Sequence, residues 1–208
     1  KAIVGLKPRR QQDIIERMKI AANAGVVAFT IDLDSAGRAA RATKGQTVEP
    51  KTPEQLRELV KASPLPLFFK GILTTDEALL CLNAGAAGIV VSNHGGRVLA
   101  DEPGTAEVLP AIADAIHGRC MILVDGCVKR GTDVEKYIAL GADACLAGRH
   151  FVRGAHGALA DGVELFANTI RNELAVAMTL TGAAKVKDIN RKMIRMTTPP
   201  PLAFGVPA

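Results

Sequence analysis

The chain has 208 residues, of which 48% are hydrophobic and 23% are charged, so it can bury one sizeable core. Its formal net charge of +5 is modest and aromatic residues make up only 3%, so we expect no nucleic-acid partner. No apolar run reaches membrane-spanning length and the first residues lack the order of a signal peptide, which predicts a soluble, cytoplasmic protein without a membrane partner.

Predicted strands and helices alternate along the chain. Three predicted helices end at a glycine, at Gly25, Gly85 and Gly141, and an apolar strand follows each of them. The expected elements begin with a weak strand over 2–4, a helix over 11–24, a strand over 26–31, a helix over 53–61 and a strand over 65–69. They continue with a helix that ends at Gly85, a strand over 88–91, a helix over 106–116, a strand over 121–124, a helix that ends at Gly141 and a strand over 144–147. Such alternation predicts parallel βαβ units.

Polar or glycine-rich residues follow five consecutive predicted strands. This pattern favours an α/β fold of the (β/α)8 TIM-barrel type, in which functional groups gather at the carboxyl ends of the strands. An open doubly wound sheet is the second interpretation. Six strands are two short of a closed barrel, so we expect a missing N-terminal segment or a partner chain to supply the others. Residues 1–196 are predicted to form the barrel domain and residues 197–208 a proline-rich tail.

The cysteines show no metal-binding or disulfide pattern. None of them forms a C-x-x-C pair, and each lies in an apolar or strand-adjacent context: Cys81, Cys120, Cys127 and Cys145. We therefore predict buried free thiols and no metal site.

The loop after the strand at 88–91 carries the first candidate site, Ser92-Asn93-His94-Gly95-Gly96-Arg97. The paired glycines let the backbone turn sharply and approach a planar ligand. In such a loop His94 can act as a base and Arg97 can bind a carboxylate. A lone loop histidine is more often structural, so the catalytic interpretation depends on the surrounding motifs.

A second glycine-rich segment runs from Val124 to Gly131, and Gly148-Arg149 follows the last predicted strand. Together with the first loop, these segments resemble the S-N-H-G-G-R, D-G-G-x-R-R-G-x-D and G-R blocks of the FMN-dependent α-hydroxy-acid oxidising enzymes, a family that includes glycolate oxidase, lactate oxidase and mandelate dehydrogenase. The resemblance extends from about residue 11 to residue 194. It implies a homo-oligomeric FMN enzyme that oxidises a small 2-hydroxy acid to the 2-oxo acid.

The resemblance also implies a role for individual residues. His94 would be the catalytic base with Asp34 as its acid partner, and Arg97 and Arg38 would bind the substrate carboxylate. Backbone amides and cations after the last two strands are suited to holding the FMN phosphate. The residues implied to bind the cofactor are Asp32, Lys70, Ser92, His94, Asp125, Gly126, Lys129, Gly148 and Arg149.

One alignment stays open, because the family's T-x-D pair matches either Thr30-Ile-Asp32 or Asp32-Leu-Asp34. In the second register Asp32 replaces a flavin-contacting threonine, and Asp34 orients His94.

The sequence departs from the family pattern at two places. Cys127 and Lys129 stand where the family has glycine and arginine, and Lys129 keeps the charge but loses the bidentate fork. Val4-Gly5-Leu6 replaces the family's Q-L-Y, so its glutamine and tyrosine are absent there. Two alternatives therefore stand beside the oxidoreductase: an FMN-binding barrel with isomerase-like activity, and a non-catalytic subunit completed by a partner chain.

Overall fold

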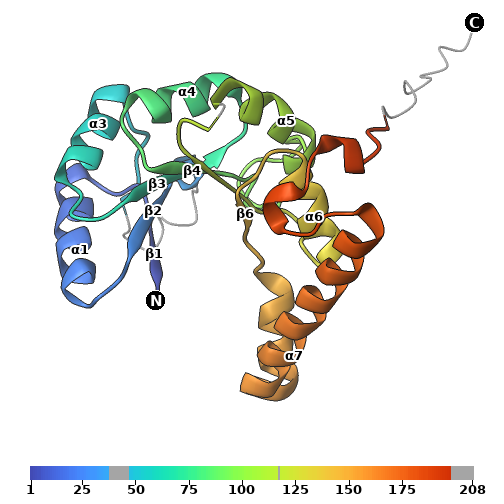
Figure 1. The fold of residues 1–208 in the computed structure, drawn as a ribbon. Coiled ribbons are helices and arrows are strands. Elements are labelled where there is room, and N and C mark those ends of the chain that lie inside the picture. The colour runs from blue at the N-terminus through green and yellow to red at the C-terminus, as the bar shows by residue number, and fades with distance from the viewer. Residues whose placement is uncertain (38–46, 117, 198–208) are drawn as a thin grey trace, which may run out of the picture.

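The computed structural model describes residues 1–37, 47–116 and 118–197. Its six described strands form one parallel sheet in which neighbours in the sequence are neighbours in the sheet. The sheet curves into a partial barrel with helices along its outer side (Figure 1). The strands are β1 (Ile3–Leu6), β2 (Ala28–Asp32), β3 (Leu67–Ile72), β4 (Gly88–Val91), β5 (Met121–Val124) and β6 (Ala144–Cys145).

The helices return the chain from the end of one strand to the start of the next. They are α1 (Gln11–Asn23), α3 (Pro53–Ala62), α4 (Thr75–Asn83), α5 (Thr105–Ile116), α6 (Gly131–Ala139) and α7 (Arg149–Thr181), with short 3₁₀ turns η1 (Leu33–Gly37), η2 (Val186–Asp188) and η3 (Arg191–Met193). Capping boxes explain where two helices begin: Thr52 with Gln55 starts α3, and Thr74 with Glu77 starts α4.

Both faces of the sheet are largely buried along the central strands β2 to β5, as expected for parallel strands, whereas the edge strands β1 and β6 are more exposed. Alternate strand residues such as Phe29, Phe69 and Ile89 pack outward against the helices. The residues between them face the barrel interior and form a smaller cluster, Ala28, Phe68, Val90 and Leu123. The strand-end side chains that follow therefore project from a rigid, packed sheet.

The predicted elements agree with the structure, with shifts at some ends. The strands at 88–91 and 121–124 have the predicted bounds, because each is an apolar run with clear polar limits. The weak first strand lies slightly later than expected, and β6 is shorter than the predicted 144–147. The doubly wound alternative is wrong, because its strand order would reverse at a switch point.

The six described strands form part of a barrel and not a closed ring of eight. After β6, α7 extends away from the sheet (Figure 1), and its helical geometry is interrupted at Ala158 and Leu159. No helix in the described ranges is both long enough and apolar enough to span a bilayer. The predicted tail lies outside the described residues apart from Thr197, so its boundary stays a prediction.

Candidate functional site

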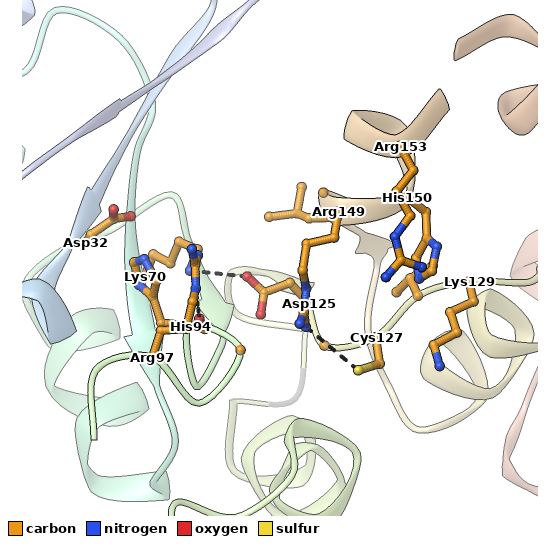
Figure 2. A pocket seen from close by; sticks show the side chains of 15 residues that line it. Asp32, Lys70, His94, Arg97, Asp125, Cys127, Lys129, Arg149, His150 and Arg153 are labelled. Atoms are coloured by element: carbon orange, nitrogen blue, oxygen red, sulfur yellow. Dashed lines mark hydrogen bonds and ion pairs between the residues drawn. The ribbon is translucent and has the colours of Figure 1, made fainter. Parts of the chain in front are cut away.

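A cavity of about 380 Å³ opens at the carboxyl ends of the strands (Figure 2). Its wall brings together side chains from β2, β3, the loops after β4 and β5, and the start of α7. The charged and histidine residues that line it are Asp32, Lys70, His94, Arg97, Asp125, Lys129, Arg149, His150 and Arg153. Cations outnumber carboxylates in this set, so the cavity is suited to anionic groups.

His94 is held in an unusual backbone conformation beside this cavity. Its φ of 54° lies in the left-handed region, which costs a residue with a side chain about 1–3 kcal/mol. Two hydrogen bonds offset that cost: the His94 N–H donates to Ser92 Oγ at 3.1 Å, and Arg97 Nε donates to the His94 carbonyl at 3.0 Å. The second bond also fixes Arg97 next to the histidine.

Asp34 contacts the imidazole of His94. Its Oδ2 lies 2.8 Å from His94 Nδ1, and both side chains are 9% exposed. Asp34 reaches this position from η1, which packs against β3 at Gly71. Gly71 has a φ of +94°, and a Cβ there would lie 2.5 Å from the Asp34 Cβ, so only glycine permits the close approach. The structure thus pairs His94 with the second carboxylate of the ambiguous motif.

Lys70, Ser92 and Asp125 form a hydrogen-bonded cluster at the cavity wall. Lys70 Nζ donates to Ser92 Oγ at 2.6 Å and lies 3.1 Å from Asp125 Oδ2. Ser92 Oγ donates to Asp125 Oδ2 at 2.9 Å. Ser92 is fully buried and lies beneath the cavity, whereas Lys70 and Asp125 line it. The cluster holds a cation and a carboxylate in fixed positions side by side.

Asp32 lines the cavity but faces a different partner. Its Oδ2 forms an ion pair with Lys7 Nζ, which comes from the residue after β1. The Asp32 side chain is 11% exposed and that of Lys7 is 25% exposed. Sequence reasoning missed Lys7, because only the β1–β2 register shows that the two strand ends meet.

The other end of the cavity is strongly basic. Lys129 comes from the loop after β5, and Arg149, His150 and Arg153 come from the first turns of α7 (Figure 2). Gly148 is the residue before this helix, so the positive end of its dipole points toward the same space. Sequence reasoning omitted Arg153, although its spacing of four from Arg149 places both on one helix face.

Two hydroxyl groups hold the backbone carbonyls of the turn after β5. Thr105 Oγ1 donates to the Asp125 carbonyl at 2.6 Å, and Tyr137 Oη donates to the Gly126 carbonyl at 2.8 Å. Gly126 has a φ of +128°, and a Cβ there would lie 2.4 Å from Thr105 Oγ1. Burial raises the pKa of Tyr137, so it stays a neutral hydrogen-bond donor. No sequence motif pointed to this role of Tyr137.

Glu102 places another carboxyl group near His94. Within the described ranges its buried Oε2 has no hydrogen-bond partner. Burial, followed by the nearby Asp34 and Glu77 carboxylates, raises the pKa of Glu102, while His94 acts in the opposite direction. No sequence motif pointed to this residue.

Most of the predicted site residues therefore meet around one cavity. Arg38 lies outside the described residues, so its predicted role is not tested by geometry. The predicted contact of Ser92 with a flavin stays a prediction, because Ser92 is fully buried and does not line the cavity. All four cysteines are free, but the expectation that they are buried holds fully only for Cys81. Cys120 and Cys145 are half-buried, and Cys127 is exposed in a left-handed turn beside Arg149.

Comparisons with known proteins point to one family. Residues 33–196 match a family model described as FMN-dependent dehydrogenase. The chain is 42% identical over 154 residues to an L-lactate oxidase of Lactobacillus jensenii, covering 74% of this chain and 37% of that protein. It is 43% identical over 142 residues to a peroxisomal (S)-2-hydroxyacid oxidase of Arabidopsis thaliana, covering 68% of this chain and 38% of that protein.

A solved structure shares the fold as well. Mandelate oxidase with 3,3-difluoro-2-hydroxy-3-phenylpropionic acid superposes with a TM-score of 0.82 at 34% sequence identity, covering 90% of this chain and 61% of that chain. The chain therefore spans less than two fifths of the two curated relatives and about three fifths of that solved chain.

Proposed function

Because this chain belongs to the FMN-dependent dehydrogenase family, we propose that it forms the FMN-binding part of an enzyme that oxidises a small 2-hydroxy acid to the 2-oxo acid. The observation that carries the proposal is the His94–Asp34 pair, 2.8 Å apart, at the wall of a cation-rich cavity. A base beside a carboxylate-binding arginine is the arrangement that such a substrate requires.

The side chains that line the cavity are of the types that the parts of FMN require. Lys129, Arg149 and the start of α7 at Gly148 form a cradle suited to a phosphate. Gly126 keeps the adjacent backbone close to that cradle, and Asp125 presents a carboxylate to ribityl hydroxyl groups. Lys70 and Asp32 remain for the ring end of the cavity. FMN, when bound, supplies the acceptor for the two electrons that leave the substrate.

The chain's own residues prepare the substrate. Arg97, with Arg38 as predicted, binds the substrate carboxylate and orients the carbon that bears the hydroxyl group. Asp34 holds the imidazole of His94 through Nδ1, which leaves Nε2 to accept the hydroxyl or α proton. The positive charge that His94 then carries is stabilised by Asp34. Lys70 contributes a fixed cation at the same wall.

Further elements complete the proposal. The described sheet is a partial barrel, so we propose that other strands, from the same polypeptide or a partner, close the ring. A homo-oligomeric state and a cytoplasmic location remain predictions. Val4 and Leu6 stand where the family has glutamine and tyrosine, and both lie outside the matched region 33–196. A non-catalytic subunit therefore stays the second candidate function.

A titration with FMN tests the proposal first. The purified chain should bind FMN, seen as a change in flavin absorbance and as saturable heat release. A 2-hydroxy acid should then bleach the bound flavin without oxygen. His94→Gln should keep FMN binding but slow bleaching by about 10²–10⁴-fold. His156→Gln, at an exposed position on α7, is the matched control and should leave both unchanged. Absence of FMN binding would refute the proposal.

A further inference from the structure

Charged side chains alternate in sign along the first strand ends of the sheet. Lys7 follows β1, Asp32 ends β2 and Lys70 lies in β3. Asp32 and Lys70 are directly paired in the parallel register, so their side chains leave the same face of the sheet about 5 Å apart. Both line the cavity. Lys70 is therefore placed between two carboxylates, Asp32 on one side and Asp125 on the other.

The structure shows how this competition is resolved. Lys70 Nζ lies 3.1 Å from Asp125 Oδ2 and donates to Ser92 Oγ, so it turns toward β4 and β5. Asp32 is instead paired with Lys7, whose ammonium group reaches it from the β1 side. Lys7 does not line the cavity. Because the Asp32 carboxylate is already neutralised by Lys7, it does not attract Lys70 away from Ser92 and Asp125.

We propose that Lys7 is a positioning residue for Lys70: by occupying the Asp32 carboxylate, it keeps the Lys70 ammonium group on the Ser92–Asp125 side of the cavity. This inference rests on the proposed function only in placing the flavin ring near Lys70. The arrangement of the side chains can be tested without any cofactor.

Crystal structures of the cofactor-free protein test the arrangement directly. In Lys7→Met, Lys70 Nζ should move from Asp125 to within hydrogen-bond distance of Asp32. In the double variant Lys7→Met/Asp32→Asn it should return to Ser92 and Asp125, because the competing charge is gone. Lys7→Arg keeps a cation and should leave Lys70 in place. An unmoved Lys70 in Lys7→Met would overturn the proposal.

The midpoint potential of bound FMN provides a second readout. A cation beside the ring favours the reduced anionic form, so Lys7→Met should lower the equilibrium constant for reduction by about tenfold, or about 30 mV for a two-electron couple. Adding Asp32→Asn should restore most of it. The matched control is Lys19→Met on the exposed face of α1, which should have no effect.

The outcomes separate the two proposals. An equal fall in potential in the single and double variants would mean that Lys7 acts through its own charge, which would overturn its positioning role. If no variant binds FMN, the proposed function fails, and the crystal structures alone decide the role of Lys7.

Discussion

Replacing Gly71 by alanine should both destabilise the protein and displace Asp34 from His94. The backbone there has a φ of +94°, and the added Cβ would lie 2.5 Å from the Asp34 Cβ and 3.0 Å from its backbone nitrogen. The left-handed conformation costs about 1–2 kcal/mol for alanine, and overpacking costs about 1–3 kcal/mol. We expect the free energy of unfolding to fall by about 2–5 kcal/mol. Because the clash includes backbone, η1 must move and the 2.8 Å contact between Asp34 and His94 must lengthen.

Urea unfolding and flavin reduction measure the two effects separately. Gly71→Ala should lower the urea midpoint, and its FMN-loaded form should be reduced by a 2-hydroxy acid as slowly as Asp34→Ala. Gly104→Ala is the control, because an added Cβ there meets nothing within 4 Å and φ is not positive. The reasoning is refuted if Gly71→Ala unfolds at the wild-type urea concentration and keeps the wild-type reduction rate.

Three further predictions concern the surroundings of the cavity. Tyr137→Phe leaves the Gly126 carbonyl without its hydroxyl donor. The free energy of unfolding, measured in urea, should therefore fall by about 1–3 kcal/mol, and the affinity for FMN should drop. An unchanged affinity would contradict the role of Tyr137. Iodoacetamide should label the exposed Cys127 first at neutral pH, because burial raises the pKa of Cys81 to about 12. Mass spectrometry of digests would show the order, and equal labelling rates of Cys127 and Cys81 would argue against this. Burial also raises the pKa of Glu102, so ionisation of this side chain destabilises the fold as the pH rises above the ordinary pKa of 4.5. Glu102→Gln should therefore be more stable than the wild type at neutral pH but not in acid. A gain in stability at both pH values would contradict this.

The sequence predicts the sheet well because its signals are local. The runs at 88–91 and 121–124 are apolar and sharply bounded, and the Thr52 and Thr74 capping boxes mark helix starts within four residues. The cavity wall also follows from the sequence, since parallel strands bring all their carboxyl ends to one edge. Knowing the order of the strands is enough to gather Lys70, His94 and Asp125.

The contacts between side chains at that edge could not be predicted in the same way. Whether Asp32 or Asp34 meets His94 depends on the short 3₁₀ turn η1 and on the room left by Gly71. The pairing of Lys7 with Asp32 depends on a register between strands that are separated by a whole helix. Such details are set by tertiary geometry, which no local pattern encodes.

The hydroxyl group of Ser92 has one hydrogen and two lone pairs, and the structure uses all three. It donates to Asp125 and accepts from Lys70 and from the His94 backbone. A single oxygen atom thus ties the ends of β3, β4 and β5 to one another. A substitution that shifts one of these strand ends should therefore shift the other two as well, so the three ends act as one mechanical unit.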